Sequence, residues 1–233
     1  MKRSVLLLAL LVAACREPDR VDARDYDAFW LWAGVAAQPE LEHARTIYLL
    51  DGEVRDGRPA RYVPLLSAPP RLRDKAVWLV VRTDALDWPD AAYERIGRDL
   101  DAWRDGNQLQ GVQIDFDAST RGLSRYAQFL SDLRRRLPPR YRLSITGLMD
   151  WSANGDPQAL RGLKGIVDEV VIQTYQGRST IWGYERYFDR MKDFPISFKV
   201  GLVEGGRWIE PRELRAEPNF RGYVVFLLPP RAR

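Results

Sequence analysis

Apolar runs with the character of β-strands recur along most of the chain. Val, Ile and aromatic residues are concentrated in eight segments, at 27–34, 45–51, 76–84, 109–117, 142–150, 167–176, 196–204 and 221–228. In the segment "LQGVQIDFD" the polar and apolar residues alternate. A strand there places Gln113, Asp115 and Asp117 on one face and the apolar residues between them on the other.

Helical spacing fills several of the intervals between these strands. Apolar residues recur every three or four positions in 90–104, behind Pro89, and again in 123–137, which ends at Pro138. A third helix is predicted near 182–193, where the spacing is less regular. The chain therefore alternates strands with helices over most of its length.

This alternation predicts an α/β protein with a compact (β/α)8 TIM barrel. About 207 residues follow position 26, close to the lower limit of roughly 200 for that fold. We therefore expect irregular or missing helices after strands 2 and 7. The segment 55–75 is rich in proline and could hold an extra strand at 60–66, and 205–220 is short. An open doubly wound sheet is the alternative, although its Gly-rich phosphate fingerprint is absent.

The N-terminus predicts export. The opening "MKRSVLLLALLVAAC" has two basic residues, an apolar run too short to span a bilayer, and a cysteine. It resembles the lipobox of bacterial lipoproteins, which implies cleavage before Cys15 and lipid attachment to it; an ordinary secretory signal is the alternative. We expect a signal peptide at 1–14, the lipidated Cys15 with a charged tether at 15–26, and one barrel domain at 27–233. The resemblance implies anchoring at the periplasmic face of the outer membrane.

Charge and composition exclude several classes of partner. Without Lys2 and Arg3 the chain has 34 basic and 32 acidic residues, which gives no electrostatic case for nucleic acid. The "RRR" at 134–136 is expected to be a solvated helix end. The chain has one His and one Cys, so His-based zinc clusters and internal disulfides are excluded. We expect no cofactor, no metal and a monomer.

In a TIM barrel the inward side chains become polar towards the mouth at the carboxyl ends of the strands. The strands would bring carboxylates, amides and aromatic rings to that mouth, namely Trp32, Arg82, Gln113, Asp115, Asp117, Asp150, Trp151, Gln173, Tyr175 and Glu204. Sugars need hydrogen-bonding groups for their hydroxyls and aromatic rings for their apolar faces. Asp115 and Asp117 would lie roughly 6.6 Å apart at Cα, close enough to raise each other's pKa. One of them could then stay protonated and serve as a general acid.

Three motifs carry a family resemblance. "GVQIDFDAST", "LSITGLMDW" and "DEVVIQTYQG", with the opening "FWLWAG", resemble domain-of-unknown-function family 3142, a group of bacterial lipoproteins. More distantly, "QGVQIDFD" is similar to the D-G-x-D-x-D-x-E motif of family 18 glycosidases, and "QTYQ" to their M-x-Y-D. The resemblance implies a glycan-active TIM barrel with Asp117 at the acid position, Asp115 as its partner and Tyr175 on the substrate. Gln110 and Gln113 stand in place of two motif acids, and Asp117 in place of the motif Glu.

We therefore predict a glycoside hydrolase-like lipoprotein that acts on an envelope or extracellular polysaccharide by carboxylate acid/base catalysis. Asp117 would be the general acid and Asp115 would tune its protonation. The second catalytic group would be a substrate acetamido group, Asp150 or Glu204, and the other mouth residues would bind substrate. One alternative is a non-catalytic glycan-binding lipoprotein that uses the same cleft. Another is an envelope scaffold with no ligand, whose mouth would be plugged by side chains. Pairing of both carboxylates with Arg82 would favour binding or a purely structural role over catalysis.

Overall fold

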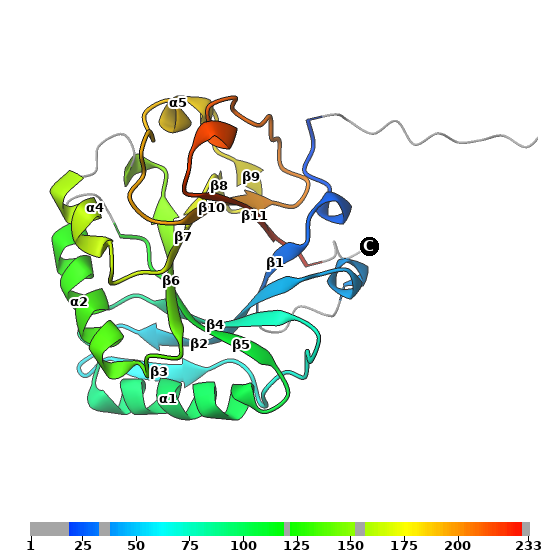
Figure 1. Ribbon diagram of the computed structural model, residues 1–233. Coiled ribbons are helices and arrows are strands. Elements are labelled where there is room, and N and C mark those ends of the chain that lie inside the picture. The colour runs from blue at the N-terminus through cyan, green and yellow to red at the C-terminus, as the bar shows by residue number, and fades with distance from the viewer. Residues whose placement is uncertain (1–18, 33–37, 119–121, 152–156, 230–233) are drawn as a thin grey trace, which may run out of the picture.

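The strands of the chain form a closed barrel. The computed structural model describes residues 19–32, 38–118, 122–151 and 157–229, and Figure 1 shows the strands as a ring. Within these residues the ring consists of parallel strands β1 (Ala28–Leu31), β2 (Thr46–Arg55), β4 (Ala76–Thr83), β5 (Gln108–Asp115), β6 (Arg142–Leu148), β7 (Glu169–Gln173), β10 (Phe198–Val203) and β11 (Phe220–Phe226). Since β1 pairs with both β2 and β11, the sheet has no open end. The predicted TIM barrel is confirmed, and the open-sheet alternative is wrong.

Helices cover the barrel unevenly, as Figure 1 shows. The two strongest helix predictions correspond to α1 (Asp90–Arg104) and α2 (Leu123–Arg136). The third predicted helix is only one turn, α5 (Glu185–Phe188), and α4 (Pro157–Leu163) precedes β7. After β2 the chain makes the antiparallel strand β3 (Arg61–Pro64), inside the expected 60–66, and after β10 a 3-10 turn at Leu214–Ala216. The two connections expected to be irregular therefore lack a regular α-helix, and the connection after β7 is irregular as well, because α5 is a single turn.

Alternation along the strands separates an inner core from an outer core. The inner core fills the barrel with Ala28, Trp30, Tyr48, Leu50, Trp78, Val80, Val171 and Val224. The outer core lies between the strands and the helices and includes Val112 and Ile114 of β5. Gln113, between them in the sequence, is fully buried and bonded to Trp30 of the inner core. The two faces predicted for this strand are therefore confirmed.

A bulge at Gly111 sets the register of β5. The pairing with β4 passes from Val77–Leu109 to Trp78–Gly111 and so skips one residue of β5. A Cβ atom on Gly111 would lie 1.9 Å from the carbonyl oxygen of Arg142 in β6. Only glycine allows the two backbones to approach this closely. The bulge therefore determines which side chains of β5 face the barrel interior.

The chain is packed against the barrel before position 27. The Val21 N–H donates to the Gly206 carbonyl at 2.8 Å, and the Trp208 N–H donates to the Asp19 carbonyl at 2.7 Å. Val21 and Ala23 are buried, and Ala23 begins a 3-10 turn, Ala23–Asp25. Residues 19–26 are therefore part of the domain, which corrects the expected boundary at 26/27. Signal peptide and Cys15 lie outside the described residues, and among those described no helix could span a membrane.

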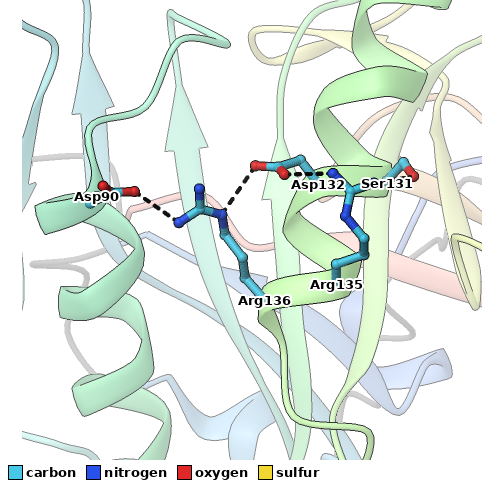
Figure 2. Close-up of polar contacts among 5 residues, drawn as sticks. All are labelled: Asp90, Ser131, Asp132, Arg135 and Arg136. Carbon is cyan, nitrogen blue, oxygen red and sulfur yellow. Dashed lines mark hydrogen bonds and ion pairs between the residues drawn. The ribbon is translucent and has the colours of Figure 1, made fainter.

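The arginines at the end of α2 are occupied by acidic and carbonyl partners. Figure 2 shows Arg136 between Asp90 of α1 and Asp132 of α2, at 2.8 and 3.1 Å. Arg135 donates to the same Asp132 at 2.8 Å. Arg134 donates to the Tyr141 carbonyl at 2.8 Å. This helix end is a local ion-pair network and presents no free basic patch, as its sequence position suggested.

Candidate functional site

A cleft of about 570 Å³ opens at the carboxyl ends of the barrel strands. Side chains from β1, β2, β4, β5, β6, β7 and β11 line it, because in-register parallel strands end at one face of the ring. Six residues predicted for the site lie in its wall: Trp32, Arg82, Asp115, Asp117, Gln173 and Tyr175. The mouth is therefore open, which disfavours the scaffold alternative with its plugged mouth.

The two carboxylates of the cleft have different surroundings. Asp115 is the last residue of β5 and is half-buried, and the Thr146 hydroxyl of β6 donates to its Oδ1 at 3.0 Å. Burial raises the pKa of Asp115 and the charge of Asp117 adds to this, while the Thr146 hydrogen bond and Arg82 oppose it. Asp117 follows the end of the strand and is exposed. One carboxyl group is therefore held in the wall, and the other projects into solvent.

Arg82 lies beside Asp115 in the sheet register but is directed to an aromatic ring. Its guanidinium carbon is 5.2 Å from the centre of the Trp32 ring. In the described part of the chain, Arg82 makes no salt bridge within 4 Å with Asp115 or Asp117. The pairing of both carboxylates with Arg82, which would favour binding or a purely structural role, is therefore not present in these residues.

Aromatic rings form one wall of the cleft. Tyr175 stacks on Phe226 at 5.7 Å between ring centres, and Trp32 meets the same Phe226 edge-on at 5.9 Å. Burial raises the pKa of Tyr175, and the charges of Asp115 and Asp117 raise it further. Its hydroxyl therefore stays protonated at neutral pH and can donate a hydrogen bond.

Gln113 lies beneath the cleft and not in its wall. Its side chain is fully buried, its Nε2 donates to the Ser144 hydroxyl at 2.9 Å, and its Oε1 accepts from the Trp30 indole at 2.5 Å. A carboxylate could accept from Trp30 but could not donate to Ser144. The amide therefore satisfies both neighbours, and its position under the floor differs from the substrate contact that was expected.

Asp150, Trp151 and Glu204 are not among the residues of the cleft wall. β6 ends at Leu148 and the chain becomes helical at 150–151, so strand alternation no longer applies there. The Trp151 ring is buried in the outer core, and its indole donates to the Ala118 carbonyl at 2.9 Å. Glu204 accepts from the Leu228 N–H at 3.0 Å. The expected second catalytic carboxylate from Asp150 or Glu204 thus has no support in the structure.

The cleft also contains residues for which no site role was predicted. Thr146 orients Asp115, while Tyr48, Ile181 and Phe226 complete the wall. Thr146 and Tyr48 could have been found from strand alternation, since Thr146 has the parity of Ser144 and Tyr48 lies in the second strand. Ile181 lies in the loop after β9 (Ser179–Thr180), where no periodicity indicates its direction.

A second hollow of about 970 Å³ lies outside the barrel, beside the starts of α1 and α2. Its wall includes Asp84, Trp88 and the ion pair of Asp87 with Arg125, at 2.8 Å. It contains none of the predicted site residues. Within the described ranges, no group of three or more His, Cys, Asp and Glu side chains could hold a metal ion.

Comparisons with known proteins give a family match and a shared fold. The family model described as "Domain of unknown function (DUF3142)" matches residues 75–186, which include β5, β6 and β7. The resemblance inferred from the motifs is thereby confirmed. Among curated proteins, no sequence matches this chain.

Solved structures share the fold at low identity. The chitinase domain of the spore coat protein CotE from Clostridium difficile is 13% identical, with a TM-score of 0.55 over 82% of this chain and 67% of that one. The Bacillus cereus spore cortex-lytic enzyme SleL is 17% identical, with a TM-score of 0.52 over 76% of this chain and 50% of that one. A tamarind chitinase-like lectin is 14% identical, with a TM-score of 0.53 over 86% and 94%. Residues 75–186 thus match the family DUF3142, on a TIM barrel with the fold of chitinase-like proteins.

Proposed function

We propose that the protein is a glycoside hydrolase-like lipoprotein that acts on an envelope or extracellular polysaccharide with Asp115 and Asp117. The observation that carries this proposal is the open cleft in which a half-buried and an exposed carboxylate share a wall with Trp32 and Tyr175. Sugar rings can stack on the aromatic side chains, and Gln173 and Tyr175 offer hydrogen bonds to hydroxyl groups. Cleavage needs a carboxylic acid and a second group that stabilises positive charge.

Burial favours Asp115 as the carboxyl that holds the proton. A general acid must be protonated near the working pH, and burial raises the pKa of Asp115. Asp117 is exposed, and as a carboxylate it would stabilise the positive charge that develops on the sugar. This order reverses the roles that the family motif implies, in which Asp117 is the acid.

Substrates with good leaving groups can test these roles. An aryl glycoside with an acidic phenol as leaving group needs no proton, whereas a natural glycosidic bond does. We expect Asp115→Asn to lower cleavage of the natural polysaccharide by about 100-fold or more and to spare the aryl glycoside. Asp117→Asn should lower both rates, and the control Asp84→Asn, at an exposed carboxylate outside the cleft, should lower neither. Equal loss of both activities in Asp115→Asn would contradict its role as the acid.

A non-catalytic glycan-binding protein is the second candidate, and Gln113 favours it. The amide is sealed between Trp30 and Ser144 and cannot exchange a proton with Asp115. Chito-oligosaccharides, peptidoglycan fragments and exopolysaccharides should be incubated with the protein and analysed by mass spectrometry. Retention of the protein by one of these glycans in affinity electrophoresis, without released products, would favour binding alone.

The lipid anchor at Cys15 and the location at the periplasmic face of the outer membrane belong to the same proposal. Their support is the apolar run and the "VAAC" ending of the N-terminal segment. Mass spectrometry of the membrane-extracted protein should find a diacylglyceryl group and an N-acyl chain on Cys15. An unmodified Cys15 thiol would contradict the anchor.

A further inference from the structure

Two large apolar side chains are exposed in the described part of the chain, and they lie near one another. Trp182 is 88% exposed and Ile209 is 49% exposed. The Tyr184 hydroxyl accepts from the Ile209 N–H at 2.6 Å and donates to the Ile209 carbonyl at 2.9 Å. Because Tyr184 is two residues from Trp182 in the sequence, these bonds bring Ile209 near Trp182. Covering an exposed tryptophan ring removes apolar surface from water, which is favourable.

The support under these two side chains is rigid. Tyr184 is buried and stacks on the buried Trp208 at 4.7 Å between ring centres. The guanidinium of Arg186 lies 5.7 Å from the centre of the Trp182 ring. A fixed base therefore presents a tryptophan, an aliphatic side chain and a cation to solvent. We call Trp182, Arg186 and Ile209 the exposed face.

The beginning of the packed chain is tied to the segment next to this face. The Asp19 carbonyl accepts from the Trp208 N–H, and the Asp19 side chain lies 3.4 Å from the Arg207 guanidinium. Arg207 and Trp208 directly precede Ile209. The chain thus enters the domain beside the exposed face.

Chain length places Cys15 close to the same point. Three residues separate Cys15 from Asp19, and the four steps between their Cα atoms span at most about 3.5 Å each in an extended chain, or roughly 14 Å in all. A lipid on Cys15 would therefore hold the bilayer surface within roughly 14 Å of Asp19. The short distance leaves the domain little freedom to turn another side towards the membrane.

We propose that the exposed face rests on the bilayer in which the Cys15 lipid is inserted. This inference depends on the lipid anchor proposed above. Trp182 would lie at the level of the lipid headgroups, where tryptophan is enriched, and Arg186 would contact lipid phosphates. Ile181, next to Trp182, lines the cleft, so the cleft opens close to the membrane surface. The contact orients the domain and brings the mouth of the barrel to glycans near the membrane.

The single cysteine of the chain makes a direct test possible. The lipid occupies the Cys15 thiol, so Trp182→Cys or Ile209→Cys supplies the only free thiol of the lipidated protein. Each variant is labelled with a polarity-sensitive fluorophore and reconstituted in vesicles of phosphatidylethanolamine and phosphatidylglycerol. Glu94→Cys is the control, because its side chain is 70% exposed on α1, which lies across the ring from α5 in Figure 1.

We expect blue-shifted emission at positions 182 and 209, quenching there by a lipid with a nitroxide near its headgroup, and neither effect at position 94. If the protein is lipidated and bound to vesicles but the fluorophore emits as in water at all three positions, the inference is overturned and the anchor is not. Failure to bind vesicles, with Cys15 unmodified, would overturn both. If the label at 182 stays aqueous and Trp182→Ala weakens glycan retention, the ring is a sugar platform and the membrane contact is wrong.

Discussion

Asp115 and Asp117 show how the end of a strand separates two chemically identical residues. β5 stops at Asp115, which the sheet holds against Thr146, and two residues later Asp117 is exposed. The difference in burial is enough to give one carboxyl a raised pKa. The end of one strand thus gives two neighbouring carboxyl groups different surroundings, as the two proposed roles require.

Thr146 can test whether Asp115 holds the proton. Its hydroxyl stabilises the Asp115 carboxylate, so Thr146→Val removes an interaction that lowers the pKa. We expect the pKa of Asp115 to rise further in the variant, measured by NMR of its side-chain carboxyl carbon as a function of pH. If the enzyme is active, the alkaline limb of its pH profile should move to higher pH. A pKa that falls or does not change would contradict the geometry described for Asp115.

Strand alternation predicted site residues reliably within the strands, and beyond strand ends its success was mixed. Asp115, Arg82 and Gln173 lie within or at the end of strands and are in the cleft wall. Beyond strand ends, Trp32 and Asp117 lie in the cleft wall as expected, whereas Asp150 and Glu204 do not, because the backbone no longer has to follow the strand direction there. Gln113 was placed on the correct face, but the sequence does not reveal that Trp30 and Ser144 occupy its amide.

At the scale of elements, a polar cluster joins the β2–β3 hairpin to α1. The Tyr62 hydroxyl of β3 donates to Asp51 of β2, and Arg95 of α1 pairs with Asp99 at 2.7 Å and covers the Tyr62 ring. Burial raises the pKa of Asp51 to about 6, with Asp99 adding to the effect and the Tyr62 hydrogen bond opposing it. This cluster makes the hairpin's attachment sensitive to pH.

The sign of that sensitivity follows from the raised pKa. Between about pH 4 and about pH 6 the folded protein binds the Asp51 proton more tightly than the unfolded chain, so stability falls as pH rises through this range. Across this range the titration of Asp51 should change the free energy of unfolding by up to about 3 kcal/mol. We expect Asp51→Asn to remove this change, measured by urea denaturation at several pH values. The control Asp101→Asn, whose side chain is 62% exposed, should retain the slope. Parallel curves for wild type and Asp51→Asn would contradict this account.

Gly111 tests the packing between β5 and β6. An alanine there would place its Cβ 1.9 Å from the Arg142 carbonyl oxygen, so one of the backbones must move. We expect Gly111→Ala to lower the free energy of unfolding by about 2–3 kcal/mol. Gly97→Ala in α1 meets no atom within 4 Å and should instead stabilise the protein by about 0.5–1 kcal/mol. Chemical denaturation compares the two, and equal stability of Gly111→Ala and wild type would contradict the bulge.

The sequence predicted elements best where several signals agree. α1 combines Pro89, regular apolar spacing and a polar outer face, and its bounds match the prediction. The segment at 182–193 has aromatic residues without that regularity, and it folds as one helical turn around Tyr184 and Phe188. The segment 15–26 was predicted to be a tether because it is charged and short of apolar residues. The sequence gives no sign of the backbone hydrogen bonds that join Asp19 and Val21 to residues 206–208.

At the scale of the whole molecule, buried polar groups link opposite sides of the barrel. Glu169 of β7 accepts from the Tyr48 hydroxyl of β2 at 2.7 Å and from the Ser144 hydroxyl of β6 at 3.1 Å. Lys199 of β10 lies 3.7 Å from the Glu169 carboxylate and donates to the Tyr48 hydroxyl at 3.2 Å. This network lies in the same interior as Gln113, which connects it through Ser144 to Trp30 at the cleft.

The ion pair within this network predicts a non-additive effect. Lys199→Met would leave the buried Glu169 charge without its cation and should cost about 3 kcal/mol of unfolding free energy. The double variant Glu169→Gln with Lys199→Met should recover most of this loss, because no unpaired charge remains. Urea denaturation of both variants measures the coupling. A Lys199→Met variant as stable as wild type would show that the pair does not stabilise the barrel.

Barrel closure was predictable because eight strand segments and two regular helices leave few other topologies. The open cleft was not predictable, since it depends on which inward side chains fill the interior. Trp78 stacks on Tyr48 deep in the barrel at 5.8 Å and fills it, whereas Trp32 and Tyr175 remain at the mouth. A chain of the same composition, with the large aromatic residues placed at other positions along the strands, would fill the mouth of the barrel with side chains.

The most direct test of the central claim is an NMR titration of the tryptophan indole N–H signals with chito-oligosaccharides and peptidoglycan fragments. Trp30 and Trp32 line the cleft, Trp88 lines the outer hollow, and Trp103 is a buried residue of α1. The account predicts shifts at Trp30 and Trp32 with one of these glycans, and none at Trp88 or Trp103. Shifts confined to Trp88, or no shift at any tryptophan with any of the glycans, would contradict a glycan site at the mouth of the barrel.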